Sequence, residues 1–149
     1  LKGFHFKMLI IGKTFDLIWP KQMLTKFNLE KDVHLLGFVP NPNVYLKKSD
    51  FLILSTFGES TPNALLEAMS YSIPVIATNV DGCSQVINES NCGLLSENRN
   101  HLDLADKVLE MLNMPLPERV RLGVNGYNYV LNNYNKGIVL KKWEKLINK

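Results

Sequence analysis

Residues 51–78 read FLILSTFGESTPNALLEAMSYSIPVIAT, and this stretch decides the fold. Two short apolar runs, 51–54 and 74–77, flank a segment, 62–72, whose apolar residues recur at helical spacing. Each run is too short for a helix and does not alternate with polar residues, so each is expected to be a strand buried on both faces. A strand, a helix and a second strand in this order predict a right-handed crossover between parallel strands.

The same alternation continues on both sides of this unit. The predicted fold class is therefore α/β, a Rossmann-like parallel sheet with helices on both faces. No repeat or low-complexity linker divides the 149 residues, so one domain over 1–149 is expected. Further strands are predicted at 6–11, 33–39 and 93–95, and further helices at 17–27, 43–49, 84–88, 101–113, 117–133 and 137–148.

Composition excludes several classes of protein. A formal net charge of +3 with no basic stripe argues against a nucleic-acid partner. No apolar run approaches the roughly 20 residues that span a bilayer. Cys83 and Cys92 lack the spacing of a zinc site, and His5, His34 and His101 stand singly, so no metal or cofactor is expected. Free thiols fit a reducing, cytoplasmic location.

The turns that follow the strands are the expected ligand sites, because open parallel sheets bind ligands at the carboxyl ends of their strands. In one of them Thr61 is predicted to cap a helix whose first residue is Pro62. The amides of 61–64 would then offer a site for a phosphate. The four turns, all rich in Gly, Ser, Thr, Asn or Pro, are 12–16, 38–43, 55–62 and 78–84.

Two glutamates flank this helix start. Glu59 lies in the loop, whereas Glu67 shares one side of the helix with Asn63 and faces away from the apolar side formed by 65, 66, 68 and 69. Glu67 is either a solvated surface residue or a ligand of hydroxyl groups at a cleft, and the residues alone leave both readings open. A phosphate site between two carboxylates suits a sugar–diphosphate–nucleoside.

The stretch 59-ESTPNALLE-67 looks like the E-x7-E signature of retaining glycosyltransferases of the GT-B fold, in the family 4 group also described as glycosyl transferases group 1. The neighbouring stretches resemble the same family, and the resemblance covers roughly residues 6–148. These stretches are 33-VHLLGFVPN-41, 49-SDFLILSTFGES-60, 67-EAMSYSIPVIATNVDG-82 and 92-CGLL-95.

The resemblance implies a role for each matching residue. Glu59 would lie beside the donor sugar as the catalytic residue, and Glu67 would bind the ribose hydroxyls. The other donor-binding residues that it implies are Gly12, Val39, Ser60, Thr61, Asn63 and Ala64. The sequence departs from the family at Gly12-Lys13-Thr14, where Gly-Asp-Gly is usual. There Lys13 is either a cation near the donor phosphates or a solvated lysine.

The implied reaction moves a sugar from a nucleotide-diphosphate donor, such as a UDP- or GDP-sugar, to a glycan or lipid-linked glycan with retention of configuration. This chain would be the C-terminal, donor-binding half of the GT-B fold. The N-terminal acceptor domain, the first strand of this domain and the basic residues that neutralise the diphosphate are expected outside it. Lys2-Gly3 lies too close to 9–11 to be that basic turn. The isolated fragment is expected to be inactive.

A P-loop is rejected because Lys7 stands where the motif needs its first glycine. A glycoside hydrolase using Glu59 and Glu67 as its carboxylate pair is the alternative enzyme, and release of free sugar would favour it. A non-catalytic nucleotide-sugar-binding module is the third class, and absence of turnover in the full-length protein would favour it.

The segment 138-IVLKKWEKLINK-149 predicts an amphipathic helix with lysines outside its apolar side. Val139, Trp143, Leu146 and Ile147 share that side. We expect the helix to dock on the N-terminal domain of the same protein, as the final helix commonly does in the family. Its lysines add weak attraction to an anionic membrane, so peripheral contact with the inner face is a second expectation.

Overall fold

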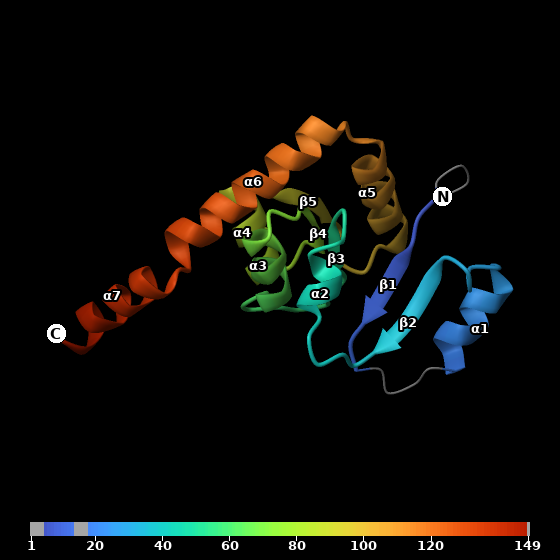
Figure 1. The fold of residues 1–149 in the computed structure, drawn as a ribbon, viewed down its shortest axis with the longest axis horizontal. Coiled ribbons are helices and arrows are strands. Elements are labelled where there is room, and N and C mark those ends of the chain that lie inside the picture. Colours follow the sequence, from blue (N-terminus) through green and yellow to red (C-terminus); the bar gives the residue numbers. More distant parts are fainter. Residues whose placement is uncertain (1–4, 14–17, 149) are drawn as a thin grey trace. The chain divides into compact units, whose positions relative to one another are not determined.

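The computed structural model describes residues 5–13 and 18–148, with the side chain of Trp19 left aside. The chain forms two compact units, Leu1–Val44 and Tyr45–Lys149. Figure 1 labels the elements. They are β1 (Met8–Ile11), α1 (Ile18–Lys26), β2 (Val33–Gly37), α2 (Asn43–Leu46), β3 (Leu52–Leu54), α3 (Asn63–Ser70), β4 (Val75–Thr78), α4 (Asp81–Ser90), β5 (Gly93–Ser96), α5 (His101–Asn113), α6 (Leu116–Asn133) and α7 (Lys136–Ile147).

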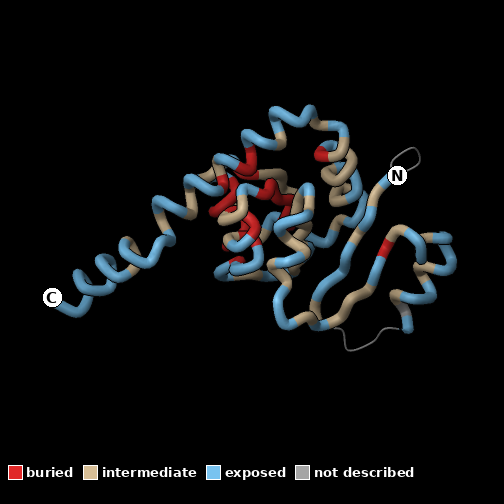
Figure 2. Tube along the Cα trace, in the orientation of Figure 1, coloured by how far each residue is buried: buried red, intermediate tan, exposed pale blue. Residues whose placement is uncertain are grey.

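The second unit is built on a parallel sheet with the strand order β3-β4-β5. β4 pairs on both sides, and Ile76 lies opposite Ile53 of β3 and Leu94 of β5. All four residues of β4 are buried, which Figure 2 shows as red tube at the centre of this unit. The prediction of a strand buried on both faces at 74–77 is confirmed.

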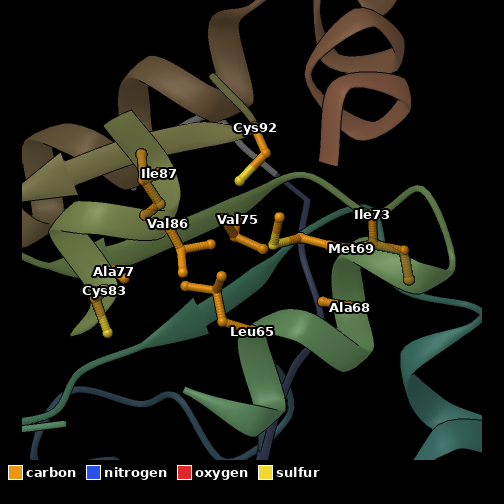
Figure 3. Packing of buried hydrophobic residues seen from close by; sticks show 10 residues of the cluster. All are labelled: Leu65, Ala68, Met69, Ile73, Val75, Ala77, Cys83, Val86, Ile87 and Cys92. Carbon is orange, nitrogen blue, oxygen red and sulfur yellow. The ribbon is translucent and has the colours of Figure 1, made fainter. Parts of the chain in front are cut away.

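Alternate side chains of β4 enter two separate cores. Val75 and Ala77 pack with buried residues of α3 and α4, and Figure 3 shows this cluster. Ile76 points to the other face, where it packs with Met111 of α5 and Leu122 of α6. Because successive strand residues face opposite sides, one strand needs helices on both faces of the sheet. The predicted α/β class with helices on both faces is confirmed.

The first unit holds its own sheet, in which β1 and β2 are parallel. β1 is less buried than β4. Leu9, Ile10 and Ile11 are 36–39% exposed. Within this unit β1 pairs with β2 alone, and the single helix α1 can cover at most one face of a two-stranded sheet. The predicted parallel strands therefore fall into two sheets, and the expectation of one domain over 1–149 stays a prediction.

Two short helices differ from their predicted bounds. α4 was predicted at 84–88 and begins at Asp81, because the amide of Ser84 already donates to the carbonyl of Val80 at 2.8 Å and closes a first turn. The prediction had placed Gly82 in the loop before the helix, whereas it lies in the first turn of α4. α2, predicted at 43–49, ends at Leu46 and continues only as hydrogen-bonded turns.

α6 approaches the rest of its unit closely at two glycines. A Cβ atom on Gly123 would lie 2.0 Å from the carbonyl oxygen of Ser72, and one on Gly126 would lie 3.0 Å from Cγ of Met69. Ser72 itself has a φ of 58°, in the left-handed region. Its turn therefore carries the chain from α3 towards β4 directly beneath α6, and only a residue without a side chain fits at 123.

Hydrogen bonds also attach α6 to α4. The Tyr129 hydroxyl donates to Oε2 of Glu89 at 2.6 Å, and Gln85 donates to Oε1 of the same carboxylate at 3.0 Å. These two bonds, that from Tyr129 first, lower the pKa of Glu89. Burial, followed by the bond to Glu89, raises the pKa of Tyr129. The Tyr129 hydroxyl therefore stays protonated throughout the physiological pH range, and its hydrogen bond to Glu89 holds α6 against α4.

α7 carries no buried residue. Trp143, Leu146 and Ile147 of its apolar side are exposed, as is the neighbouring Leu140, and Val139 is half-buried. Among the described residues, no helix is long and apolar enough to span a membrane.

We predict that Gly123→Ala lowers the free energy of unfolding by about 1–3 kcal/mol, the usual cost of overpacking, because its Cβ would meet the Ser72 carbonyl. The matched control is Gly137→Ala in α7, where the nearest atom is 3.5 Å away. The control should leave the stability unchanged or raise it by up to about 1 kcal/mol. Urea titration measures both, and equal stabilities for the two variants would contradict the close packing of α6.

Candidate functional site

A hollow of about 490 Å³ lies where the loops after β3, β4 and β5 meet. This is the carboxyl edge of the parallel sheet of the second unit, where such folds bind ligands. The expected turns 55–62 and 78–84 both contribute to it, and so do the predicted site residues Glu59 and Ser60. Its lining residues are Phe57, Gly58, Glu59, Ser60, Asn79, Val80, Asp81 and Asn98.

The loop that carries Glu59 is attached to β4 at its start. The hydroxyl of Thr78 accepts from the amide of Thr56 at 3.1 Å and donates to the carbonyl of the same residue. The hydroxyl of Thr56 in turn accepts from the amide of Gly58 at 3.3 Å. Thr78 is buried, so the loop begins from a fixed point at the end of the central strand.

The Glu59 backbone is held a second time by α4. The amide of Gly82 donates to the carbonyl of Glu59 at 2.9 Å. A Cβ atom at position 82 would lie 2.4 Å from that carbonyl oxygen and 2.7 Å from the carbonyl oxygen of Ser60. Only glycine therefore lets the loop rest on the first turn of α4.

Cys83 lies fully buried directly after this contact. Burial raises the pKa of its thiol, and the negative charge of Glu59 raises it further. The side chain of Glu59 is half-buried and lines the hollow together with Asp81 at the start of α4. A carboxylate in such a position can interact strongly with a bound ligand, because solvent screens it less than it screens a fully exposed group.

The start of α3 differs from the prediction. The N-cap is Pro62 rather than Thr61, no side chain caps the helix, and the first helical residue is Asn63. The carbonyl of Thr61, and not its hydroxyl, is engaged, because it accepts from the amide of Asn63 at 2.9 Å. Within the described part of the chain, the amides of Ser60, Thr61 and Ala64 donate to no protein oxygen. Three amides therefore remain available to an anion at this helix start.

Glu67 and Asn63 are both exposed on α3, and they face away from the buried Leu65, Ala68 and Met69. The predicted helix phase is confirmed. Neither side chain lines the hollow beside Glu59. A solvated surface residue and a ligand of hydroxyl groups both fit this position, so the ribose role of Glu67 stays a prediction.

The remaining predicted site residues belong to the first unit. Gly12 follows β1 with a φ of 149°, and its amide donates to the carbonyl of Gly37 at 2.9 Å. Lys13 is exposed and Val39 is half-buried. Their roles at the donor stay predictions, and Thr14 and Lys2-Gly3 lie outside the described residues.

Three residues with polar side chains line the hollow but were not predicted as site residues. Asn79 and Asp81 lie in the turn 78–84, which the sequence had marked as a ligand site without selecting residues in it. Asn98 lies in the turn between β5 and α5, and this turn was overlooked although 96-SENRN-100 is as polar as the others. Among residues 5–13 and 18–148, no three acidic, histidine or cysteine side chains converge as metal ligands.

The described geometry is that of a Rossmann-like domain. At the carboxyl edge of its sheet lie a glutamate with a fixed backbone and a helix start without a side-chain cap. The sequence matches the family described as glycosyl transferases group 1 over residues 4–129, and the chain belongs to this family. It is 34% identical over 128 residues, 85% of its length, to the uncharacterized glycosyltransferase MJ1178 of Methanocaldococcus jannaschii. The solved structures that it resembles are GT-B glycosyltransferases, so the predicted fold family is confirmed.

Two further similarities come from Staphylococcus aureus. The chain is 29% identical, over 85% of its length, to a poly(ribitol-phosphate) alpha-N-acetylglucosaminyltransferase. It superposes with a TM-score of 0.83 and 28% identity on TarM in complex with fondaparinux, alpha-GlcNAc-glycerol and UDP, over 96% of this chain and 29% of that one. It spans 35% of the length of the archaeal relative and 26% of the staphylococcal enzyme.

We predict that Gly82→Ala displaces the Glu59 loop and lowers the free energy of unfolding by about 1–3 kcal/mol, the cost of an overpacked contact. Gly58→Ala is the matched control in the same site, because no atom lies within 4 Å of its Cβ position. Urea titration gives the stabilities, and the amide resonances of Glu59 and Ser60 report the displacement. Unchanged resonances in Gly82→Ala would show that α4 does not hold the loop.

Proposed function

We propose that the protein transfers a sugar from a nucleotide-diphosphate-sugar donor to a glycan or lipid-linked glycan with retention of configuration. This chain would supply the donor site as the C-terminal half of the enzyme. The observation that carries the proposal is the arrangement beside β3: a half-buried Glu59, followed by three unengaged amides at the start of α3. It occurs in a member of a glycosyltransferase family, and a related structure contains UDP.

The amides account for the chemistry of the leaving group. When the bond between the sugar and the diphosphate of the donor breaks, negative charge develops on the diphosphate. The amides of Ser60, Thr61 and Ala64, at the positive end of α3, can bind this charge more strongly in the transition state than in the bound donor. The proposed mechanism needs no metal or other cofactor.

Glu59 would lie beside the donor sugar, and Glu67 would bind the ribose. In the family that the sequence resembles, the leaving phosphate is thought to help deprotonate the acceptor on the same face, so Glu59 need not act as the nucleophile. Gly12, Lys13 and Val39 are proposed to complete the donor site. A hydrolase with the same carboxylates would release free sugar instead of a glycoside.

The acceptor would bind an N-terminal domain of the same protein. The chain spans about a third of the archaeal relative, which leaves room for such a domain. We propose that α7, whose apolar side has no buried residue, docks on it. The proposed location is cytoplasmic, with peripheral contact to the inner face of the membrane through the lysines of α7.

The docking of α7 predicts a difference in amide exchange over residues 138–148. Exchange should be rapid in the isolated chain, because the apolar side of α7 is exposed, and slower in the full-length protein. Mass spectrometry after deuterium labelling measures it, and α5 serves as an internal control with equal protection in both proteins. Equal and strong protection of α7 in both would contradict docking.

For Glu67→Ala we predict a loss of about 1.5–3 kcal/mol in nucleotide binding, the range for hydrogen bonds to a charged group. Calorimetric titration with UDP, GDP and ADP measures the loss and also identifies the base. Glu110→Ala, which removes an exposed helical carboxylate on α5, is the control and should bind like the wild type. An unchanged nucleotide affinity in Glu67→Ala would show that Glu67 is a solvated surface residue.

For Glu59→Gln in the full-length enzyme, we predict a strongly reduced kcat with little change in the affinity for the bare nucleotide. The reason is that Glu59 would contact the sugar, which the bare nucleotide lacks. Steady-state kinetics and calorimetry give the two quantities, and NMR of the product gives its anomeric configuration. Equal losses in kcat and in nucleotide affinity would place Glu59 at the diphosphate or ribose, and an inverted product would overturn the proposed retention.

A further inference from the structure

Two side chains from different loops lie next to each other at the rim of the hollow beside Glu59. Phe57, in the loop after β3, lines the hollow and is 75% exposed. Arg99, in the turn after β5, places its guanidinium carbon 5.8 Å from the centre of the Phe57 ring. An aromatic face and a cation therefore stand together at the edge of the site.

The turn that carries Arg99 is held by its own hydrogen bonds. Oδ1 of Asn100 accepts from the amides of Leu102 and Asp103 at 3.1 and 3.0 Å. Nδ2 of Asn100 donates to the Glu97 carboxylate at 2.8 Å, and the amide of Glu97 donates to the Asp103 carboxylate at 2.6 Å. The turn is therefore preorganised, and both neighbouring carboxylates already accept hydrogen bonds from other groups.

The guanidinium of Arg99 has no carboxylate partner in the part of the chain that the structure describes. The ion pairs there are Lys7–Asp32 and Lys107–Glu110. Arg99 also has a φ of 61°, a left-handed conformation that is uncommon for arginine. The side chain is thus exposed on a fixed turn, with its charge free to bind an anion.

We propose that Phe57 and Arg99 form a subsite for one end of an acidic acceptor, a sugar or polyol that carries a phosphate or carboxylate group, while the rest of the acceptor binds the N-terminal domain. This proposal rests on the glycosyl transfer proposed above. A guanidinium binds phosphate or carboxylate through two parallel hydrogen bonds. The exposed ring offers an apolar face to the C–H side of a sugar. The two side chains together recognise an acid attached to a carbohydrate better than either part alone.

The subsite is distinct from the proposed diphosphate site, although both lie close to Ser60. The hollow contains Ser60, whose amide is proposed to bind the diphosphate, but it contains no residue of α3. The other walls of the hollow come from the loops after β4 and β5. A molecule bound at Phe57 therefore lies in the same hollow as Glu59, which is proposed to contact the donor sugar.

The test uses the full-length protein saturated with whichever of UDP, GDP and ADP binds most tightly, and the probes glucose 6-phosphate, glucuronate and glucose. Both acids should bind more tightly than glucose in NMR titrations. Arg99→Gln should weaken both acids by about tenfold or more, as expected for hydrogen bonds to a charged group, and leave the affinities for glucose and nucleotide unchanged. Phe57→Leu should weaken all three probes.

Arg121→Gln is the control, because it removes the same charge from an exposed position on α6 and should bind every probe like the wild type. If both arginine variants lower the affinity for the acids equally, the effect comes from net charge alone, and the subsite is overturned. Weaker nucleotide binding in Arg99→Gln, with the acids unchanged, would assign Arg99 to the donor. If no nucleotide binds the wild type, the proposed function fails, and the same probes on the unloaded protein still decide the subsite.

Discussion

The burial of β4 on both faces and its pairing on both edges set the arrangement of the second unit. Val75 and Ala77 contribute to one core and Ile76 to the other, so a slip of one residue would exchange the two sets of side chains. The register of β3 and β5 against β4 is fixed in this way. As a result, all three strands end at one edge, and their loops meet around Glu59.

Much of this unit could be predicted from the sequence because its strands are apolar throughout and its helices have clear apolar sides. The differences have physical reasons. β1 reads like β4 in composition, yet it has only one neighbouring strand and one helix in its own unit, and a sequence pattern does not show how many elements are available to cover it. At the start of α3, Thr61 is a good capping residue, but its carbonyl forms a tight turn that leaves the hydroxyl unused for capping.

The candidate site, too, could be predicted from the sequence only in part. Glu59 could be found because its spacing to Glu67 is written in the sequence. The role of Gly82 could not, since it depends on the Glu59 carbonyl lying 2.9 Å from an amide that is distant along the chain. Asn98 could have been predicted, because it follows a strand as Asn79 does. Phe57 and Arg99 would not attract notice singly, and only the structure brings them together.

The thiol of Cys83 has a practical consequence. It is buried beneath the loop of Glu59, next to the glycine on which that loop rests, and a reagent in solution cannot reach it in the closed arrangement. Chemical labelling of this sulfur requires α4 to separate from the loop. The labelling rate therefore reports how often the site opens. Cys92, equally buried but packed below α6, opens with a different part of the core. The protein thus carries two native reporters, one for the site and one for the core that supports it.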